Sequence, residues 1–439
     1  MIENLLLPSF EGLEPPEWLL RLVAEGLGGV VLFAPNVRDA EQLSALTDEL
    51  RSENPRLLIA IDEEGGDVTR LHWATGSRYP GNGALGVVDD TALTERVAAS
   101  IGGELAAVGV NLDFAPVADV NVDPANPVIG SRSFGDDAAL VARHVAAFVR
   151  GLQSRGVAAC AKHFPGHGAT DRDSHVELPT LAGEVRDGLP PFAAAIDAGV
   201  QSVMTAHVRV PAFGDLPATV DPKVMALLRG ELAYDGVVIG DACDMRAFAG
   251  SVGVVDGAVR ALSIGVDALI VGRGLGEEAI ARIRAAGGRV PRERIAEAAA
   301  RVERLAEWAA SPQAADADLD AGREAARRAL LVEGDVSLEG PPEIVEVRGE
   351  PNVAAGPAAH SLADLVPSTQ EGLLVLVVHD AHRHAHMRER VEAHPEAVVV
   401  ETGLPHWRPA HVRGYIATYG GSRASLEAVA ELLVEKVPA

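Results

Sequence analysis

Cysteine is nearly absent from this sequence, because Cys160 and Cys243 are the only two in 439 residues. Two cysteines are too few for a disulfide framework and are typical of a chain kept in a reducing compartment. No run approaches the ~18 apolar residues of a membrane-spanning helix, and the first residues lack the cationic stretch of a secretory signal. These absences predict a cytoplasmic protein that is not inserted in a membrane.

Basic residues are also scarce, with 38 Lys and Arg against 63 Asp and Glu, which gives a formal net charge of −25. A field of this sign repels phosphate backbones and anionic lipid, so nucleic acid and membrane are not expected partners. The expected ligand is a small molecule. It is either neutral or an anion that a few local cations hold.

Short apolar segments alternate with helical stretches through the first two thirds of the chain, which is typical of an α/β fold. Most of these segments show little alternation of apolar and polar residues, as expected of parallel strands that are covered on both faces. They predict a (β/α)₈ TIM-like barrel over residues 1–310. We expect its strands near Asn4–Leu7, Gly29–Phe33, Leu57–Ile61, Asn111–Phe114, Val157–Ala161, Gln201–Thr205, Gly236–Gly240 and Asp267–Val271.

The composition changes after the Ala/Arg/Glu-rich helical stretch Pro291–Trp308. Residues 311–335 are expected to form a helical linker, which includes a helix over Gly322–Leu331. Residues 336–439 then predict a second, smaller α/β domain that ends in a helix over Ser425–Val437. Its expected strands are Glu343–Val347, Leu373–His379, Ala397–Glu401 and Gly414–Thr418.

Polar residues follow five of the expected barrel strands at the point where each strand ends. In a barrel of this kind the loops after the strands build the active site, so these side chains are candidates to meet there. One polar residue after one strand is commonly a helix cap, but five at five strand ends favour a site. The residues are Asp62, Arg132, Lys162 with His163, His207 and Asp241.

The densest polar stretch is the glycine-punctuated segment Lys162–His175, which carries three histidines. Its spacing matches no standard zinc motif, although metal ligation and an inert polar loop both remain open. Acid/base chemistry is the interpretation that we favour. Gly166 and Gly168 give the backbone freedom, so that Asp173 and His175 could move into and out of a site.

The same segment, read as KHFPGHG…DSH, resembles the signature of glycoside hydrolase family 3 β-N-acetylglucosaminidases. The resemblance covers most of residues 1–310, and the smaller domain resembles the appended α/β domain of two-domain bacterial members. Further similar stretches occur in the family's order. They are Asp62–Gly66 with Arg70, Asn111–Val120, Asn126–Gly135 and Asp241–Met245.

The resemblance places the family's nucleophilic aspartate on Asp241, at the end of the apolar strand Gly236–Gly240. Asp244 is the rival, but barrel geometry puts it at the start of the next helix, where an aspartate commonly caps backbone N–H groups. The family usually has Ser or Thr immediately before the nucleophile, and Gly240 stands there in this chain. The missing hydroxyl puts the turnover rate in question, though not the role of Asp241.

The family also implies a His–Asp dyad in place of a carboxylic acid, and the matching residues are His175 and Asp173. An imidazole titrates near neutral pH, which suits a group that gives and then takes a proton. Asp173 would hold the tautomer and stabilise the imidazolium. The competing interpretation is that His175 only finishes a surface loop.

By the same resemblance, a terminal N-acetylglucosamine would be held by the remaining strand-end residues. Asp62 can accept hydrogen bonds from two sugar hydroxyls. Asp119, Asp123 and Asn126 are expected to organise the loop before Arg132 rather than to touch sugar. The expected donors are Arg70, Arg132, Lys162 and His163, with His207 and Met245 lining the pocket.

Other features carry less weight. The histidine patch His379, His382, His384 and His386 has the spacing of a metal site, but no carboxylate or cysteine cluster completes it, so a solvated loop is expected. Both cysteines are expected to pack as small apolar residues. The glycine turn Gly272–Gly276 could cradle phosphate, although such turns are common at barrel strand ends.

Together these observations predict an exo-acting, retaining β-N-acetylglucosaminidase that needs no metal or organic cofactor and acts as a monomer or homodimer. The resemblance implies cell-wall muropeptide fragments, as in peptidoglycan recycling, or short chitin-derived sugars as substrates. One alternative is a glycoside phosphorylase or β-glucosidase of the same family, because a histidine acid/base does not repel phosphate. The other is a non-catalytic sugar-binding protein that retains the barrel.

Overall fold

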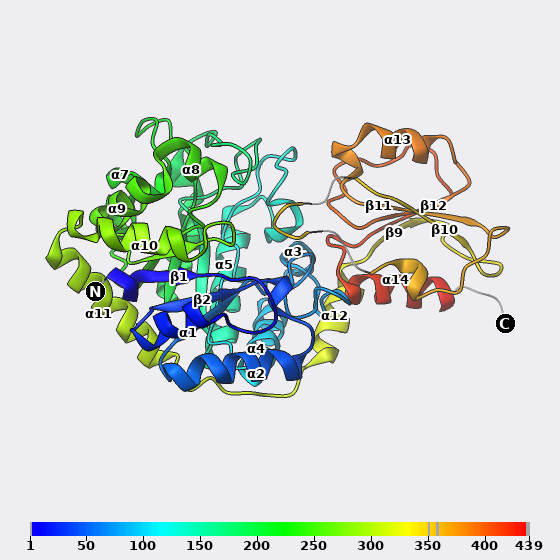
Figure 1. The fold of residues 1–439 in the computed structure, drawn as a ribbon. Helices are drawn as coiled ribbons and strands as arrows, with labels where there is room; N and C mark the ends of the chain where they lie inside the picture. The colour runs from blue at the N-terminus through cyan, green and yellow to red at the C-terminus, as the bar shows by residue number, and fades with distance from the viewer. Residues whose placement is uncertain (1, 350–351, 357–359, 436–439) are drawn as a thin grey trace.

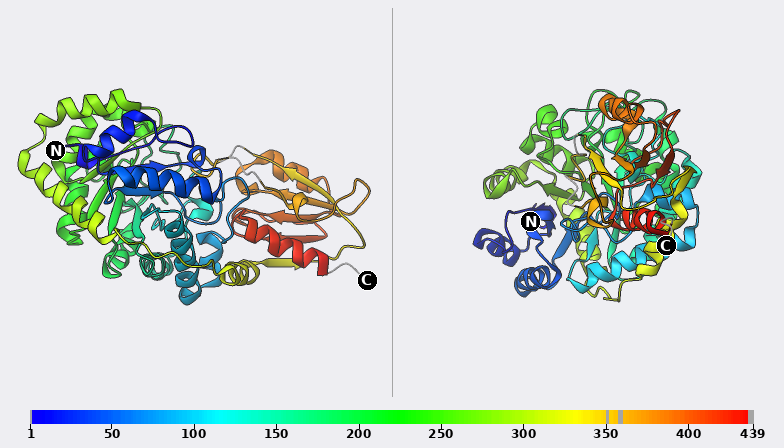
Figure 2. Two further views of the ribbon diagram at one scale, coloured as in Figure 1. Left: turned by 60° about the horizontal axis from the view of Figure 1, so that its bottom comes forward. Right: turned by 90° about the vertical axis from the view of Figure 1, so that its right-hand side faces the viewer.

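The computed structural model describes residues 2–349, 352–356 and 360–435. The chain forms two lobes, a large barrel and a smaller sheet domain, that make an elongated molecule (Figure 1; Figure 2, left). Buried apolar residues form a large cluster in the barrel and separate clusters on the two faces of the second sheet. The two-domain expectation is confirmed.

The barrel sheet contains eight parallel strands in the order β1-β8-β7-β6-β5-β4-β3-β2. This order brings β2 back beside β1, where the Gly28 N–H donates to the Glu3 carbonyl at 3.2 Å and nearly closes the barrel. Each of the eight expected segments overlaps one strand, although β1 and β5 run past the ends of theirs. The strands are β1 (Leu6–Pro8), β2 (Gly29–Leu32), β3 (Leu58–Ile61), β4 (Leu112–Asp113), β5 (Ala158–Phe164), β6 (Ser202–Thr205), β7 (Val237–Gly240) and β8 (Ala268–Val271).

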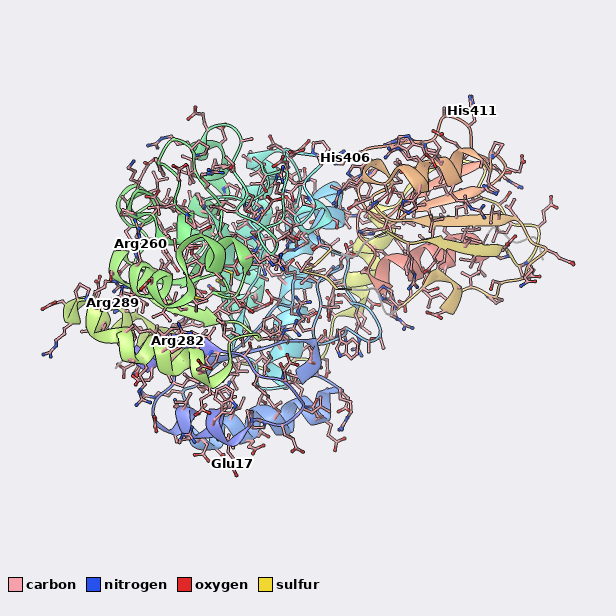
Figure 3. The ribbon with its side chains drawn as sticks, turned by 45° about the horizontal axis from the view of Figure 1, so that its top comes forward. Glu17, Arg260, Arg282, Arg289, His406 and His411 are labelled. Atoms are coloured by element: carbon pink, nitrogen blue, oxygen red, sulfur yellow. The ribbon has the colours of Figure 1, made fainter. Side chains whose placement is uncertain are left out.

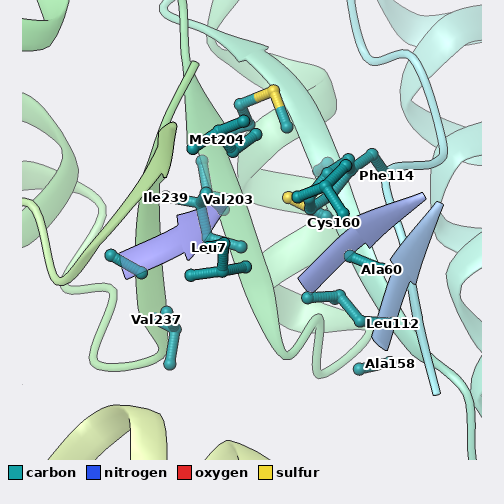
Figure 4. Packing of buried hydrophobic residues seen from close by; sticks show 14 of the residues in the cluster. Leu7, Ala60, Leu112, Phe114, Ala158, Cys160, Val203, Met204, Val237 and Ile239 are labelled. Carbon is teal, nitrogen blue, oxygen red and sulfur yellow. The ribbon is translucent and has the colours of Figure 1, made fainter. Parts of the chain in front are cut away.

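The strands are buried at every position, because helices cover their outer face and side chains fill the interior. Figure 4 shows Leu7, Leu112, Val203 and Ile239 among the residues gathered between the strands. These side chains fill the lower barrel as a packed core. The space that can hold a ligand therefore lies at the mouth, where the strands end.

Helices surround the barrel, and the aspartates at their starts act as caps. Asp39 accepts from the Gln42 N–H and Asp137 accepts from the Leu140 N–H. The helices are α1 (Glu17–Ala24), α2 (Ala40–Glu53), α3 (Asn82–Val88), α4 (Thr91–Ala107), α5 (Ala138–Gln153), α6 (Pro190–Asp197), α7 (Pro222–Ala226), α8 (Arg246–Val252), α9 (Val254–Ile264), α10 (Gly276–Ala286) and α11 (Arg292–Trp308). Within the described residues no single helix is long and apolar enough to cross a membrane, although the bent pair α8 and α9 together pass that test.

The second domain has a five-stranded sheet in the order β10-β11-β12-β13-β9, with β9 antiparallel to β13. The expected linker 311–335 therefore needs correction, because β9 lies within it and belongs to this sheet. Helices α13 and α14 lie on opposite faces of the sheet (Figure 1). The elements are α12 (Leu319–Ala329), β9 (Leu331–Gly334), β10 (Glu343–Val347), β11 (Leu374–Val378), α13 (Ala385–Glu392), β12 (Val398–Glu401), β13 (Gly414–Ala417) and α14 (Arg423–Glu435).

The two domains meet at the mouth of the barrel. Helix α12 packs against α3 and α4 of the barrel and against α14 of the second domain. Asp67, in the loop after β3, accepts a hydrogen bond of 2.8 Å from the Gly421 N–H, which follows β13. His382 Nε2 lies 2.8 Å from the carbonyl oxygen of Pro124. The strand ends of both sheets therefore face the same region.

Candidate active site

A cavity of about 1050 Å³ lies at the mouth of the barrel and is bounded on one side by the second domain. Loops that follow the barrel strands form one wall, and residues around β10, β11 and β12 form the other. Most of the residues that the sequence singled out line this cavity. They are Asp62, Arg70, Arg132, Lys162, His163, His175, Asp241 and Met245.

Asp241 follows β7 directly, and its half-buried carboxylate faces the cavity. Its Oδ1 accepts a hydrogen bond of 2.7 Å from the Ala242 N–H. A Cβ built on the preceding Gly240 would lie 3.0 Å from Leu269 Cδ2 and 3.3 Å from Thr219 Cγ2. A Ser or Thr side chain there would therefore start among carbon atoms of Leu269, Thr219 and Val266.

Asp244 also lines the cavity, but it does not cap the next helix as expected. Helix α8 begins at Arg246 and has no side-chain cap. Asp244 Oδ2 instead accepts a 3.4 Å hydrogen bond from the Gly274 N–H, in the loop after β8. Its carboxylate lies so close to Gly272 that a Cβ there would come within 1.6 Å of Oδ1. Asp244 is thus packed against the β8 loop, because glycine at position 272 leaves room for it.

His175 and Asp173 form a close pair. His175 Nδ1 lies 2.6 Å from Asp173 Oδ1, and the same oxygen accepts the His175 backbone N–H at 2.8 Å. Burial opposes ionisation of Asp173, but the hydrogen bonds and charge of His175 outweigh it and lower the pKa of the carboxyl. The imidazole is 32% exposed and Asp173 only 13%, so His175 is the member of the pair that reaches the cavity. Within the described part of the chain, its Nε2 has no hydrogen-bond partner.

The loop that carries the dyad is tied to the helix that follows Asp241. The Ala247 N–H donates to the Ser174 carbonyl at 3.2 Å, and the Arg246 N–H donates to the His175 carbonyl at 3.4 Å. These bonds place the imidazole on the same side of the cavity mouth as the β7 strand end. The expected meeting of His175 and Asp241 at one site is therefore consistent with the main chain.

His167 braces this loop from inside. Its Nδ1 lies 2.9 Å from Thr170 Oγ1 and its Nε2 lies 3.0 Å from Ser174 Oγ. Burial lowers the pKa of His167 to about 4, so the ring is neutral near pH 7. Both ring nitrogens have partners within the loop, so His167 holds the loop in place and has no nitrogen left for proton transfer.

The floor of the cavity is a chain of alternating charges. Lys162 Nζ lies 2.7 Å from Asp62 Oδ1 and 2.6 Å from Glu64 Oε1. Glu64 also accepts two hydrogen bonds from the Arg132 guanidinium, at 2.8 and 2.9 Å. Burial opposes the ionisation of Glu64, yet Arg132 and Lys162 outweigh it and hold its pKa far below the usual range. These contacts fix the donors and acceptors that face a ligand.

Glu64 was missed by the sequence analysis, although the motif that contains it was noted. Its signal was available, because it lies two residues after Asp62 at the end of β3. Residues two apart on an extended segment point to the same side. The pairing with Arg132 and Lys162, however, depends on contacts 68 and about 100 residues apart in the sequence.

The loop before Arg132 is organised by the polar residues expected there. Asp119 is fully buried, lies 2.7 Å from His163 Nδ1 and accepts the His167 N–H at 2.6 Å. Asn126 Oδ1 accepts the N–H groups of Val128 and Ile129 at 3.0 and 2.8 Å. Asp123 accepts the Ala125 N–H at 2.8 Å. These side chains hold backbone in place, as the sequence indicated.

Arg70 joins the two domains within the site. One nitrogen of its guanidinium lies 3.8 Å from Asp62 Oδ2 and donates to the Ala354 carbonyl of the second domain at 2.7 Å. Asn352 donates to the Val128 carbonyl at 3.0 Å, and Ala354 packs against an apolar cluster that includes Val128. The second domain therefore helps to position a side chain of the cavity.

His207 lies outside the lining of the cavity, unlike the other predicted substrate-binding residues. It is fully buried, with Nδ1 2.9 Å from Thr219 Oγ1 and Nε2 3.0 Å from the Ala242 carbonyl. Its ring packs on Phe248 with centroids 4.8 Å apart, and burial lowers its pKa. His207 supports the backbone next to Asp241 through the Ala242 carbonyl, and Phe248 covers its ring.

The remaining candidates fall into two groups. His379 and His384 line the cavity from the second domain, whereas the sequence predicted only a solvated loop there. Cys160 and Cys243 are both buried and free, and burial raises the pKa of the Cys160 thiol to about 12. A thiol of this kind is inert, in agreement with the packing role predicted for both cysteines.

This site combines a strand-end carboxylate, an oriented imidazole and a charged floor at the mouth of a (β/α)₈ barrel, an arrangement that can support acid/base and nucleophilic chemistry on a polar ligand. Residues 14–305 match the family model described as the glycosyl hydrolase family 3 N terminal domain. The chain is therefore a glycoside hydrolase, and it belongs to glycosyl hydrolase family 3.

Individual relatives agree with this assignment. A β-hexosaminidase of Chromobacterium violaceum is 40% identical over 257 residues, which cover 56% of this chain and 71% of the relative. β-Hexosaminidase A of Pseudoalteromonas piscicida is 37% identical over 281 residues, 58% of this chain, and the match spans 47% of that longer relative. The solved structure of a glycoside hydrolase family 3 β-N-acetylglucosaminidase from Paenibacillus sp. str. FPU-7 aligns with a TM-score of 0.88 at 32% identity, and covers 100% of this chain and 96% of that one.

Proposed function

We propose that the protein is an exo-acting, retaining β-N-acetylglucosaminidase that removes a terminal β-linked N-acetylglucosamine. The observation that carries the proposal is the His175–Asp173 pair, on a loop bonded to the start of α8 and facing the cavity that Asp241 also lines. The names of the two bacterial hexosaminidases and of the Paenibacillus enzyme support the choice of sugar.

The reaction uses Asp241 as nucleophile and His175 as acid and then base. The Asp241 carboxylate attacks the anomeric carbon while His175 Nε2 gives its proton to the glycosidic oxygen, so that the leaving sugar departs as an alcohol. The neutral imidazole then takes a proton from water, whose oxygen attacks the anomeric carbon and releases Asp241. Two inversions retain the configuration.

Asp173 serves this cycle by its charge and position. It accepts the Nδ1 proton of His175 at 2.6 Å, which directs Nε2 toward the cavity in the correct tautomer. Its lowered pKa keeps it ionised at neutral pH, so it stabilises the imidazolium form that donates the proton.

The charged floor is suited to hydroxyl groups of a saccharide. Asp62 presents carboxylate oxygens, while Lys162 and Arg132 present donors whose charge Glu64 partly balances. We assign the terminal sugar to this floor, with Arg70 and His163 as additional donors and Met245 as an apolar contact. Candidate natural substrates are cell-wall muropeptide fragments and short chitin-derived sugars.

Release of chromophore from an aryl β-N-acetylglucosaminide tests this proposal directly. The wild type should release it with retention, and Asp241→Ala should lose activity by several orders of magnitude while Asp256→Ala, an exposed control on α9, keeps it. A 2-fluoro or 5-fluoro sugar should label Asp241 and no other residue. Sugar binding without any release would favour the non-catalytic alternative, and appearance of sugar 1-phosphate in phosphate buffer would favour a phosphorylase.

A further inference from the structure

The cavity extends beyond what one terminal sugar occupies. Its volume of about 1050 Å³ lies slightly above the range of ~300–1,000 Å³ typical of pockets for drug-sized ligands. One part of its lining is a rim formed by Phe33, Trp73 and Arg273, from the loops after β2, β3 and β8. The mechanism described above assigns these three side chains no role.

Arg273 differs from every other arginine in the lining. The other four each have a carboxylate partner, in the pairs Arg70–Asp62, Arg132–Glu64, Arg348–Glu346 and Arg383–Asp380. Among residues 2–349, 352–356 and 360–435, Arg273 has none. Its exposed guanidinium lies over the Phe33 ring, 5.0 Å from the centroid, and this cation–π contact holds it without neutralising it. In a protein of net charge −25, an unpaired cation in a cavity is a binding feature for an anion.

Trp73 offers the rim an apolar face. Its side chain is among the large hydrophobic ones that stay exposed, at 44%. The indole N–H donates to the Val37 carbonyl at 2.7 Å, so its only polar atom is satisfied and the ring is fixed. A fixed, exposed aromatic face in a sugar-binding cavity suits the C–H face of a pyranose ring.

The surroundings of Arg273 argue against phosphate as its anion. The nearby Gly274 N–H already donates to Asp244 Oδ2 at 3.4 Å, so it is not free to cradle a phosphate. Glu277 and Glu278 occupy the first turn of α10, where they oppose a doubly charged group. A single planar guanidinium instead matches the two oxygens of a carboxylate.

We propose that Phe33, Trp73 and Arg273 form the subsite for the leaving group, and that this subsite selects a saccharide that carries a carboxylate. Trp73 stacks on the sugar ring and Arg273 pairs with its acid group. The inference rests on the proposed function, because it assumes that the floor around Asp62 holds the terminal sugar. It favours acidic, cell-wall-type substrates over neutral chitin fragments.

The test compares two disaccharides that differ in one group. Both carry N-acetylglucosamine β-linked to a second sugar, which bears a carboxylate in one and the corresponding primary amide in the other. The wild type should show kcat/KM at least about fivefold higher for the acid at low salt, and this preference should shrink as ionic strength rises. Arg273→Gln should abolish the preference by lowering only the value for the acid. Trp73→Ala should lower both values to a similar extent, because its ring would stack on the second sugar of either substrate.

Two further variants complete the design. Arg273→Lys should keep part of the preference, because it retains charge but loses the fork of donors. Arg282→Gln, an exposed arginine on α10 (Figure 3), is the matched control and should keep all of it. Equal turnover of acid and amide by the wild type, or equal losses for both in Arg273→Gln, would overturn the subsite. Failure of the wild type to cleave the aryl glycoside would overturn the proposed function instead, and titration of the free acidic sugar then tests Arg273 by binding alone.

Discussion

Ala247 donates its backbone N–H to the carbonyl oxygen of Ser174 at 3.2 Å. This bond joins the loop that carries His175 and Asp173 to helix α8, which begins five residues after Asp241. The position of the proposed acid/base group relative to the proposed nucleophile is therefore set by main-chain contacts rather than by a long side chain. Changes to the His175 side chain should alter proton transfer without displacing the loop.

Replacing His175 with alanine should slow hydrolysis in a way that depends on the leaving group. Positioned general acids contribute roughly 10²–10⁴-fold, so we expect a loss of that order for unactivated disaccharides. Dinitrophenyl glycosides need little protonation, and their glycosylation step should be nearly unaffected. The measurement uses a series of aryl glycosides of increasing leaving-group pKa. The rate should fall more steeply with leaving-group pKa in the variant than in the wild type.

His411→Ala is the matched control, because His411 is an exposed histidine at the far end of the second domain (Figure 3). It should leave the whole series unchanged. A uniform loss across leaving groups in His175→Ala would contradict the acid role. Asp173→Asn should reproduce the pattern of His175→Ala in weaker form, because the imidazole remains but its tautomer is no longer held.

His167 should make folding stability depend on pH. Its pKa of about 4 in the folded protein lies below the ~6.5 of an unfolded histidine, so the unfolded chain binds this proton first as the pH falls. The free energy of unfolding should therefore decrease as the pH falls from about 6.5 to 4, with a contribution from His167 of up to about 1.4 kcal/mol per pH unit. Above pH 6.5, His167 should contribute no pH dependence.

Urea titrations of the wild type and of His167→Gln over this range check the expectation. The variant should be less stable at pH 8, because the amide cannot span both Thr170 Oγ1 and Ser174 Oγ. Its stability should nevertheless change less between pH 6.5 and 4. Parallel profiles for the two proteins would show that His167 already binds a proton in the folded state.

Much of the barrel and its site could be predicted because the relevant signals are local. Runs such as Leu58–Ile61 and Ala268–Val271 are apolar throughout, which marks parallel strands covered on both faces. Once the strands are located, barrel geometry brings their carboxyl ends together. That is enough to place residues as distant as Asp62 and Lys162 at one site, where they pair at 2.7 Å.

The features that the sequence did not reveal depend on contacts through space. His207 follows a strand as the other site residues do, but Phe248 covers it from a helix that begins 39 positions later. Strand β9 was assigned to a linker because four residues without an apolar alternation give little signal, and only pairing with β13 defines it. Likewise, nothing near Arg70 in the sequence indicates that its partner is the Ala354 carbonyl of another domain.

Removing the charge of Glu64 should destabilise the protein strongly. Glu64 is buried and balances Lys162 and Arg132, both also buried. Glu64→Gln removes the ion-pair partner of Arg132 and one of the two carboxylates paired with Lys162, and breaking a buried ion pair typically costs about 3–5 kcal/mol. Chemical denaturation measures the loss. Glu307→Gln, which removes a partner of Arg56 in an exposed pair, should cost less than about 1 kcal/mol. Similar losses for both variants would mean that Glu64 contributes no more than a surface charge.

The bond between Arg70 and Ala354 predicts that the second domain influences substrate binding through Arg70. Asn352 holds the segment that contains Ala354, because it donates to the Val128 carbonyl at 3.0 Å and its own Oδ1 accepts the Ala354 N–H at 2.9 Å. Asn352→Ala should free this segment, weaken the hold on Arg70 and raise KM several-fold. The kcat for an aryl glycoside should stay within about twofold of the wild-type value, since neither Asp241 nor His175 contacts Asn352. Asn54→Ala, at the end of α2 and remote from the cavity, is the control that should change neither constant. The double variant Asn352→Ala/Arg70→Ala shows whether the two residues act through one contact. In that case each single variant raises KM and the double variant raises it no further. Fully additive effects on the binding free energy would show that Arg70 works independently of the second domain.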